Sequence, residues 1–441
     1  MTSLPRLTVL GTGYLGATHA VCMASLGYEV LGMDVDEDKI KRLAAGEVPF
    51  HEPGLPDMLA SALASGKLRF TTSYEEVAEF GDVHFLCVGT PQKKGEYAAD
   101  MTYVDAVTAG LIPHLKRPSL IAGKSTVPVG TAERLREWIR RAAPAGEAVD
   151  LAWNPEFLRE GYAVADTLTP DRLVFGVTSP EAEATLRSAF QPILALGTPL
   201  VVTDLATAQL VKVAANSFLA TKISFINAMA EVCEATHADV KKLSEALSHD
   251  TRIGGRFLHA GLGFGGGCLP KDIRAFMARA GELGVDQALS FLREVDAINM
   301  RRRARMIDLV RELTDDGLRG ARIACLGATF KPNTDDVRDS PALDVAASLH
   351  ARGAAVSVYD PQGNETARVR HPELTYVTSA VEAARDADVV LHLTEWREFR
   401  DMDPSVLSDI VASKKIVDGR NALDPAQWRG AGWVYRALGR P

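Results

Sequence analysis

Short apolar runs alternate with helical stretches from the start of this 441-residue chain, and the same alternation returns toward its end. A parallel strand needs a crossover connection, usually a helix, before the next parallel strand begins. The alternation therefore predicts α/β domains whose parallel sheets are covered by helices on both faces. The expected strands are Leu7–Leu10, Glu29–Met33, Val83–Val88, Leu120–Gly123, Leu151–Trp153, Leu173–Val177, Arg322–Gly327, Val356–Asp360, Val389–Leu393 and Lys415–Asp418.

Between the two alternating regions the pattern becomes helical. Residues 204–236 contain no Gly or Pro, and Asp204 is a suitable N-cap, so we expect one long, largely buried helix. Further helices are expected from Val240 to Leu247 and from Lys271 to about Leu313. The predicted domains are an N-terminal α/β domain (1–203), a helical middle domain with a cysteine loop and a dimer surface (204–314), and a C-terminal α/β domain (315–441).

Composition argues against several classes of protein. The five cysteines are scattered and lack CxxC spacing, which favours free thiols in a reducing cytoplasm and no metal site. A net charge of -8 without a basic block gives no support to nucleic-acid binding. The chain shows no membrane-spanning apolar run and no leader peptide. We therefore expect a cytoplasmic protein without nucleic-acid or membrane partners, although small phosphate-bearing ligands remain possible.

The first expected strand leads into Gly11-Thr12-Gly13-Tyr14-Leu15-Gly16 and then into an alanine-rich helix. In a dinucleotide-binding turn, the first glycine permits the bend, the second admits the pyrophosphate and the third lets the helix pack closely. The second strand ends in Asp34, where a carboxylate accepts hydrogen bonds from a ribose and repels a 2′-phosphate. The pattern predicts a Rossmann-like NAD site; the alternative is a glycine turn that binds nothing.

Three more loops follow expected strands. Because ligands lie at the carboxyl ends of strands in open α/β sheets, Val88–Pro91 and Lys124–Pro128 are expected over the cofactor. Ordinary turns are the alternative. The segment Asn154–Glu160 offers carboxylates at Glu156 and Glu160, which are either functional or part of a solvated acidic turn.

Cys268 follows a run of glycines at 261, 263, 265, 266 and 267. Such a run fits neither helix nor strand and indicates a loop that approaches something closely. Pro270 suits the first turn of a following helix, whose dipole would favour a thiolate at its N-terminus. Cys268 is therefore a candidate nucleophile. The remaining cysteines stand in apolar runs and are interpreted as buried hydrophobic residues: Cys22, Cys87, Cys233 and Cys325.

Lys212 and Asn216 are four residues apart in the expected long helix and therefore share one face. A lysine buried there must find a partner or shift its protonation, which makes Lys212 a candidate for catalysis. The alternative is a lysine whose ammonium reaches solvent beside a polar neighbour.

Together these motifs resemble the UDP-glucose/GDP-mannose dehydrogenase family over almost the whole chain. The motifs are Gly11–Gly16, Ser125–Pro128, Asn154–Leu158, Leu210–Asn216, the cysteine loop, and Phe330–Arg338. The resemblance implies two Rossmann-like domains joined by a long central helix and a helical middle domain. It also implies NAD-dependent four-electron oxidation of a nucleotide sugar by a homodimer or larger homo-oligomer. UDP-glucose is the expected substrate, with GDP-mannose and UDP-N-acetylhexosamines as alternatives.

The resemblance also implies a role for individual residues. Cys268 matches the nucleophile, Asp272 and Lys212 hold an ordered water, and Asn216 helps to stabilise oxyanion charge. Glu156 activates the hydrolytic water and Thr126 orders water and cofactor. The cofactor contacts are Gly11, Gly13, Tyr14, Leu15, Asp34, Lys39, Thr90, Thr126, Glu160 and Arg338. The substrate contacts are Glu156, Phe157, Leu158, Glu160, Lys212, Asn216, Arg252 (across the dimer interface), Phe264, Gly265, Lys331 and Arg420.

The chain departs from the family pattern at three positions. It has Gly267 where the family often has Ser or Tyr, Lys39 where some relatives have Arg, and His259 where some have Lys. The change at His259 puts one substrate contact in doubt. Two other classes are weighed against this prediction. A two-electron hydroxy-acid dehydrogenase needs neither the thiol nor a second α/β domain, and a non-catalytic NAD sensor would lack Cys268, Lys212 and Asp272.

Overall fold

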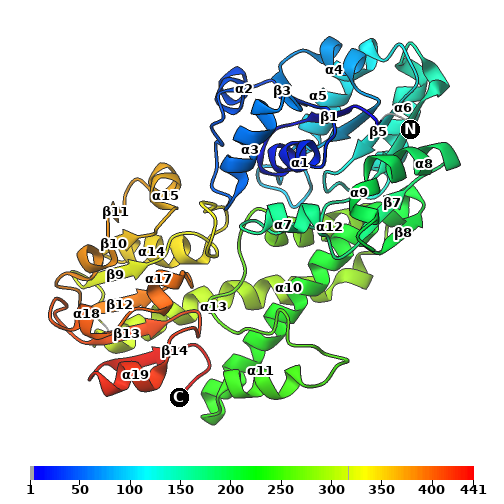
Figure 1. Cartoon of the computed structure of the whole chain (residues 1–441). Coiled ribbons are helices and arrows are strands. Elements are labelled where there is room, and N and C mark those ends of the chain that lie inside the picture. Colours follow the sequence, from blue (N-terminus) through cyan, green and yellow to red (C-terminus); the bar gives the residue numbers. More distant parts are fainter. Residues whose placement is uncertain (1–3, 316) are drawn as a thin grey trace. The chain divides into compact units, whose positions relative to one another are not determined.

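The computed structural model describes residues 4–315 and 317–441 and divides into two compact units. The N-terminal unit contains the chain up to Ala215 together with Arg274–Leu283, and the second unit contains Asn216–Ile273 and Gly284–Pro441. Two helices, α10 (Leu205–Thr236) and α12 (Leu269–Glu282), therefore contribute residues to both units. Each unit contains one sheet built on parallel strands (Figure 1), so the predicted fold class is confirmed.

The sheet of the N-terminal unit has eight strands in the order β3-β2-β1-β4-β5-β6-β7-β8. All neighbours are parallel except β6 and β7, which meet antiparallel at Trp153 and Gly176. The strands are β1 (Leu7–Leu10), β2 (Val30–Met33), β3 (Leu68–Thr71), β4 (Val83–Leu86), β5 (Ser119–Gly123), β6 (Val149–Trp153), β7 (Leu173–Gly176) and β8 (Leu200–Thr203).

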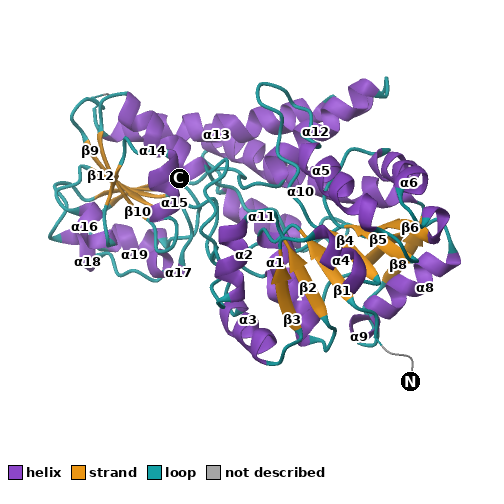
Figure 2. Ribbon diagram, turned by 90° about the horizontal axis from the view of Figure 1, so that it is seen from above, coloured by secondary structure: helices purple, strands orange, loops and turns teal. Residues whose placement is uncertain are grey.

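Helices cover both faces of this sheet (Figure 2). On one face Leu7 and Val9 pack in a buried cluster with residues of α1, α3, α8 and α9, and on the other Leu10 and Leu31 pack with residues of α4, α5 and α6. Because side chains alternate along a strand, successive residues supply the two cores. The helices are α1 (Tyr14–Ser25), α2 (Glu37–Ala44), α3 (Leu55–Ala64), α4 (Tyr74–Phe80), α5 (Thr102–Leu111), η1 (Ile112–His114), α6 (Thr131–Ala142), η2 (Gly146–Ala148), α7 (Ala163–Leu168), α8 (Pro180–Ala189) and α9 (Gln191–Leu194).

The second unit has a six-stranded parallel sheet in the order β11-β10-β9-β12-β13-β14. The strands are β9 (Arg322–Leu326), β10 (Ala355–Tyr359), β11 (Thr375–Tyr376), β12 (Val389–His392), β13 (Lys415–Asp418) and β14 (Val434–Ala437). The helices and the 3-10 turn outside the N-terminal unit are α11 (Val240–Ser248), η3 (Asp286–Leu289), α13 (Phe291–Leu313), α14 (Pro341–Ala351), α15 (Asn364–Arg370), α16 (Ala380–Ala384), α17 (Arg397–Arg400), α18 (Ser405–Ser408) and α19 (Pro425–Gly430).

The sequence predicted every internal strand and missed four strands, which are the two edges of each sheet: β3, β8, β11 and β14. An interior strand of a parallel sheet is buried on both faces and is continuously apolar, whereas an edge strand is partly solvated. In β8, Val201 and Val202 are exposed, and β11 is only two residues long. The signal used for prediction is therefore weakest at the edges.

The long helix is confirmed, since α10 spans 32 residues and the Asp204 carboxylate accepts a hydrogen bond from the Thr207 amide at 2.7 Å, as an N-cap does. The prediction that it is largely buried is wrong for one face. Phe218, Phe225 and Val232 are 66%, 48% and 53% exposed. Apolar periodicity shows which residues avoid water, but it does not show whether this chain itself covers them.

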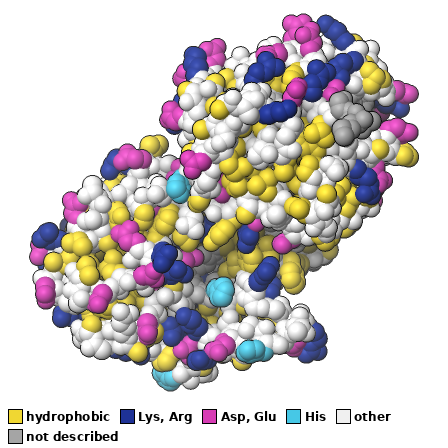
Figure 3. All heavy atoms as spheres, in the orientation of Figure 1, with side chains coloured by type: hydrophobic (Ala, Val, Ile, Leu, Met, Phe, Trp, Pro, Cys, Tyr) yellow, Lys and Arg dark blue, Asp and Glu magenta, His cyan; other side chains and the backbone are white. Residues whose placement is uncertain are grey.

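The helical material expected from Lys271 to about Leu313 is divided between two helices, because α12 ends at Glu282 and α13 begins at Phe291. Gly284 stands between them with φ +73°, a left-handed conformation that ends helices and that glycine adopts at low cost. Among the described residues, no helix is both long enough and apolar enough to cross a membrane. On the face drawn in Figure 3, acidic and basic side chains are interspersed over each unit.

The glycine turn after β1 predicts a difference between two alanine substitutions. A Cβ at Gly16 would lie 1.8 Å from the Gly11 carbonyl oxygen, whereas a Cβ at Gly13 would meet nothing within 4 Å. Gly16→Ala should therefore lower the free energy of unfolding by about 1–3 kcal/mol, the usual range for overpacking. Gly13→Ala is the matched control and should leave it nearly unchanged. Thermal unfolding of both variants checks this, and equal melting temperatures would contradict it.

Candidate active site

The turn between β1 and α1 is shaped to receive an anion. Gly11 has φ +91° and its amide donates to the Met33 carbonyl at 2.8 Å, which fixes the bend. Gly13 caps α1 without a side-chain hydrogen bond, and the first turn of α1 contains no acidic residue. Within residues 4–315 and 317–441, no side chain caps the amides at the start of α1, and the space beside Gly13 is open. A pyrophosphate fits this arrangement of donors and helix dipole.

Asp34 directly follows β2 and is 9% exposed. Its Oδ2 accepts from the Thr12 amide at 2.9 Å and from Lys39 Nζ at 2.9 Å, while Oδ1 accepts from the Asp36 amide at 3.1 Å. Burial raises the pKa of Asp34, but Lys39 and the amides outweigh it and hold the pKa below its ordinary value. The carboxylate is thus ionised and fixed beside the turn, as ribose binding requires.

The loops after β4 and β5 are joined by hydrogen bonds. Thr90 Oγ1 donates to the Thr126 carbonyl at 2.7 Å, and Ser125 Oγ donates to the Val88 carbonyl at 2.7 Å. Thr90 is buried and Thr126 half-buried. The structure thus brings together the two loops that the sequence placed separately over the cofactor.

Glu156 lies in the segment after β6 and has defined partners for both oxygens. Oε1 accepts from the amides of Phe157 and Leu158 at 2.8 and 3.0 Å, and Oε2 forms an ion pair with Lys124 Nζ at 2.9 Å. Burial raises the pKa of Glu156, but Lys124 and the two amides together lower it below its ordinary value. The sequence identified Glu156 and missed its partner, although Lys124 stands directly after an apolar strand, which is an unusual place for lysine.

A buried acid that the sequence analysis missed connects this segment with α1. Glu52 is 2% exposed and accepts from the amides of Gly161 and Ala163 at 2.7 and 2.8 Å and from the Tyr14 hydroxyl. The turn that follows Glu160 is therefore held to the first residue of α1. The available signal was an acid directly before a proline and two residues after an aromatic one, in Phe50-His51-Glu52-Pro53.

In the second unit, Cys268 is exposed and immediately precedes α12, with Pro270 in the first turn as predicted. The Asp272 amide donates to the Cys268 carbonyl at 2.9 Å, so the cysteine occupies the N-cap position. A thiolate is favoured there by the helix dipole. The other cysteines are buried, and burial raises the pKa of three of them to about 12: Cys22, Cys87 and Cys325.

Asp272 and Asn216 are brought together, since Asn216 Nδ2 donates to Asp272 Oδ2 at 2.6 Å and both side chains are buried. Lys271 Nζ forms an ion pair with Asp272 Oδ1 at 2.5 Å. In the N-terminal unit, Lys212 is half-buried and its ammonium lies 5.5 Å from the centre of the Phe157 ring. Helical spacing places Lys212 one turn before Asn216 on α10.

The glycine loop before Cys268 approaches other parts of its own chain. A Cβ at Gly265 would lie 2.3 Å from the Asp339 carbonyl oxygen, and one at Gly263 would lie 2.3 Å from Asn299 Oδ1. Asn299 is buried, accepts from the Phe264 amide at 2.7 Å and donates to the Phe264 carbonyl at 3.0 Å. Sequence reasoning missed Asn299, which lies between the apolar residues Ile298 and Met300 in α13.

Arg420 donates to three backbone carbonyls: Leu393 at 2.7 Å, Gly263 at 3.1 Å and Phe330 at 2.9 Å. It also pairs with Glu395. Arg420 thus joins the glycine loop to the segments after β9 and β12. The predicted substrate contact Phe264 is likewise buried and contributes its backbone to this support.

The remaining predicted residues of the second unit lie nearer the surface. Arg338 pairs with Asp336 at 2.7 Å, and a Cβ at Gly267 would lie 2.3 Å from the Arg338 guanidinium carbon. The Lys331 ammonium lies 5.3 Å from the centre of the Phe330 ring. Arg252 is exposed and pairs with Asp250 at 2.6 Å.

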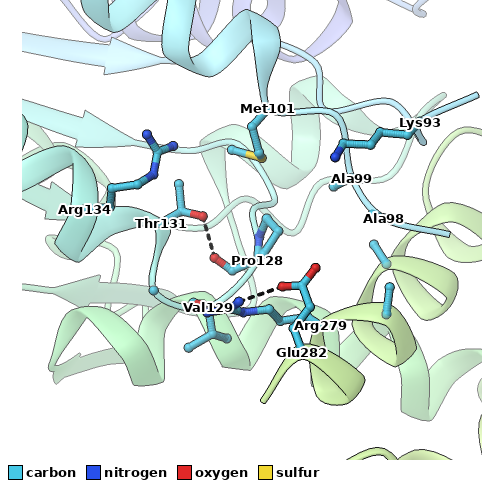
Figure 4. A pocket seen from close by; sticks show the side chains of 13 residues that line it. Lys93, Ala98, Ala99, Met101, Pro128, Val129, Thr131, Arg134, Arg279 and Glu282 are labelled. Atoms are coloured by element: carbon cyan, nitrogen blue, oxygen red, sulfur yellow. Dashed lines mark hydrogen bonds and ion pairs between the residues drawn. The ribbon is translucent and has the colours of Figure 1, made fainter. Parts of the chain in front are cut away.

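The N-terminal unit also has a cavity of about 270 Å³ lined by the segment around Lys93 and Met101, the start of α6 and the last turns of α12 (Figure 4). Pro128, from the predicted cofactor loop Lys124–Pro128, lines it, whereas none of the individually predicted catalytic, cofactor or substrate residues does. Arg279 Nε donates to the Val129 carbonyl at 3.0 Å, and Arg279 also pairs with Glu282. This contact attaches α12 to the loop that follows Thr126.

The fold and the turn at Gly11–Gly16 define a dinucleotide-binding α/β protein. Three family models match in order: the UDP-glucose/GDP-mannose dehydrogenase family NAD binding domain (residues 5–194), central domain (206–301) and UDP binding domain (324–425). The chain belongs to the UDP-glucose/GDP-mannose dehydrogenase family. It is an NAD-dependent nucleotide-sugar dehydrogenase.

Relatives match over their whole length. A UDP-glucose 6-dehydrogenase of Rhizobium meliloti is 40% identical over 438 residues, which cover 99% of this chain and 100% of the relative. A UDP-glucose dehydrogenase structure from Pyrobaculum islandicum matches with a TM-score of 0.91 at 37% identity, covering 100% of this chain and 99% of the other. A UDP-D-ManNAc dehydrogenase structure from Pyrococcus horikoshii matches with a TM-score of 0.86 at 27% identity, covering 99% of both.

The position of Asp34 predicts a change in cofactor use. We expect Asp34 to accept hydrogen bonds from the ribose of NAD. In Asp34→Asn the Thr12 amide would keep an acceptor, but the ribose hydroxyls would lose a charged one. Because hydrogen bonds to charged groups contribute about 1.5–3 kcal/mol, the KM for NAD should rise about tenfold or more, and discrimination against NADP should weaken. Steady-state kinetics with both cofactors measures this. Asp38→Asn, at a 94% exposed side chain of α2, is the control and should behave as wild type.

Proposed function

We propose that this protein oxidises UDP-glucose to UDP-glucuronate in two NAD-dependent steps and retains the intermediate on Cys268. The observation that carries the proposal is the full-length match, at 40% identity, to a relative named UDP-glucose 6-dehydrogenase. The exposed cysteine at the N-cap of α12 supports a covalent route, because a thiol is otherwise unnecessary in a dehydrogenase.

Bound NAD would supply the hydride acceptor for each oxidation. The residues that would hold it are those of the Gly11–Gly16 turn, whose amides face an open space, and Asp34, whose fixed carboxylate suits the ribose. Further cofactor contacts are assigned by matching the family pattern: Tyr14, Leu15, Lys39, Thr90, Thr126, Glu160 and Arg338.

Cys268 adds to the aldehyde carbon after the first oxidation and holds it as a thiohemiacetal. The second oxidation converts this adduct to a thioester, so the aldehyde is not released between steps. We assign the first proton acceptance to Asp272 and Lys212 acting through water. Asn216, which the Asp272 carboxylate orients, donates to the developing oxyanion, an effect worth roughly 3 kcal/mol per donor.

Glu156 accepts a proton from the water that hydrolyses the thioester. Its lowered pKa keeps it ionised and ready to accept that proton. The sugar nucleotide is assigned to Glu156, Phe157, Leu158, Glu160, Lys212, Asn216, Arg252, Phe264, Gly265, Lys331 and Arg420. For Phe264 and Arg420, the contacts within the chain support a role in shaping the substrate side of the cysteine loop.

We also propose a homodimer formed through α10, whose exposed Phe218, Phe225 and Val232 recur every seven residues along one face. Exposed Arg252 is then available to reach a partner's substrate. We further propose that the chain has three domains, which comprise residues 1–203, 204–314 and 315–441. We also propose that the protein is cytoplasmic. The location is supported by cysteines without metal or disulfide spacing and by the need for a pool of NAD.

The proposed reaction fixes a stoichiometry. With limiting UDP-glucose and excess NAD, absorbance at the NADH band should report two NADH per sugar nucleotide. One NADH would indicate an ordinary two-electron dehydrogenase and contradict the proposal. Parallel assays with GDP-mannose and UDP-N-acetylmannosamine test which sugar nucleotide is the substrate. Faster turnover with either one would make it the proposed substrate in place of UDP-glucose.

The covalent route predicts a specific defect in Cys268→Ser. Its turnover of UDP-glucose should fall by about 100-fold or more, because the hydroxyl is a far weaker nucleophile than the thiolate. Cys233→Ser, at a buried cysteine of α10, is the control and should retain turnover. Rapid acid quench and mass spectrometry should find a sugar adduct on wild-type Cys268. Turnover of Cys268→Ser at the wild-type rate would contradict the covalent scheme.

A further inference from the structure

Lys124 is a buried cation in the N-terminal unit to which the proposed mechanism gives no role. Its side chain is 3% exposed, and its amide donates to the Leu86 carbonyl at 2.9 Å, which fixes its backbone at the end of β5. Its ammonium lies 2.9 Å from Glu156 Oε2 and donates to Asn154 Oδ1 at 2.9 Å. A buried lysine is costly to ionise, so both partners are needed to hold the charge.

Asn154 is itself fixed. It is 1% exposed, its amide donates to the Gly123 carbonyl at 2.8 Å, and its Nδ2 donates to the Val174 carbonyl at 3.0 Å. With Nδ2 directed at Val174, Oδ1 faces Lys124. The lysine is therefore held by rigid neighbours on one side and meets the Glu156 carboxylate on the other.

Three titratable side chains that face this pair carry no charge near neutral pH: His19, Cys22 and Cys87. Burial, followed by the charge of Lys124, lowers the pKa of His19 on α1 well below its usual range. Burial raises the pKa of Cys22 and Cys87 to about 12, with Glu156 adding to both effects. Lys124 is therefore the cation that balances Glu156 inside this cluster.

Charged groups elsewhere around the pair have other partners. Glu52, which also faces Cys22, accepts its hydrogen bonds from Tyr14, Gly161 and Ala163. The positive ends of Arg172 and Lys212 lie over the Phe157 ring, at 3.6 and 5.5 Å from its centre. They are neighbours of the segment, whereas Lys124 contacts the Glu156 carboxylate directly.

We propose that Lys124 is a positioning residue for hydrolysis, which acts by holding the Glu156 carboxylate ionised and in one orientation. This inference rests on the proposed function. In the hydrolytic step, water oxygen bonds to the thioester carbon as the carbon–sulfur bond breaks, one water proton passes to Glu156, and the Cys268 thiolate leaves. The proton then returns to the thiolate or to solvent, so the step needs no further reactant.

Loss of Lys124 should therefore affect one step more than the others. Burial would then act on Glu156 without its main opposing charge, and the carboxyl would bind a proton at higher pH. A protonated Glu156 cannot accept the proton of water. The thioester should accumulate, whereas its formation, which depends on Cys268 and its neighbours, should continue.

The test compares Lys124→Met with Lys41→Met, which removes a 69% exposed lysine on α2. In Lys124→Met we expect kcat near pH 7 to fall by about 100-fold, the scale of general-base catalysis. The acid limb of its kcat profile should move to higher pH, and mass spectrometry after acid quench should show the Cys268 thioester as the main steady-state species. Lys41→Met should match wild type in all three measurements.

A measurement without turnover tests the same pair. Since folding lowers the pKa of Glu156, the pair stabilises the fold above the unfolded-state pKa of about 4.3, and this contribution is lost as pH falls through the lower folded-state value. The stability difference between wild type and Lys124→Met should be largest above the raised Glu156 pKa of the variant. It should shrink as pH falls through that pKa and then through the lower wild-type value. If Lys124→Met does not fold, the double variant Lys124→Met with Glu156→Gln removes both charges, and it should fold and accumulate the thioester.

Several outcomes would overturn the inference. These are an unmoved acid limb in Lys124→Met, equal loss of thioester formation and hydrolysis, or a pH-independent stability difference. Failure of the proposed function appears separately, because wild type would then form no thioester from UDP-glucose. Lys124→Arg keeps the positive charge and should recover a large part of kcat and the wild-type acid limb. If Lys124→Arg instead showed the same kcat and acid limb as Lys124→Met, this would also count against a role for the charge.

Discussion

The register of the parallel strands determines the positions of the residues that directly follow five strands of the N-terminal sheet. Leu10 pairs with Met33 and Leu86, and Gly123 pairs with Leu86 and Trp153, so five strands end at one level. The next residue on each strand is Gly11, Asp34, Cys87, Lys124 or Asn154. Their amides, Asp34 apart, donate to the neighbouring strand at 2.8–2.9 Å. Gly11 and Cys87, which are 87 − 11 = 76 positions apart, thus become neighbours through backbone hydrogen bonds, and Lys124 and Asn154 follow along the same edge of the sheet.

The same construction occurs in the second unit with a different result. Gly327 has φ +115° and its amide donates to the Tyr359 carbonyl at 2.8 Å, as Gly11 donates to Met33. Asp360 then follows β10 as Asp34 follows β2. However, Asp360 is 2% exposed, and Trp396 Nε1 donates to its Oδ2 at 3.1 Å in addition to backbone amides of the turn. Its carboxylate serves the fold itself, whereas Asp34 retains access to a ligand.

Sequence patterns could predict features that depend on local chemistry. The internal strands, the Asp204 cap and the start of α12 at the cysteine follow from apolar runs, capping residues and proline geometry. The edge strands could not be predicted in this way, because part of each edge strand is exposed to solvent and its residues need not form a continuous apolar run. Individual site residues such as Glu156 were also visible as polar groups after strands. Their partners were not, because the Lys124–Glu156 and Asn299–Phe264 contacts depend on tertiary pairing between distant segments.

The contact between Gly267 and Arg338 limits how the nucleophile loop can vary. The space that a side chain at position 267 would enter is filled by the Arg338 guanidinium. A serine or tyrosine introduced before Cys268 must therefore displace that arginine, whose partner is Asp336. Directed evolution of this loop should vary positions 267, 336 and 338 together. In libraries that change position 267 alone, most new side chains would collide with the Arg338 guanidinium.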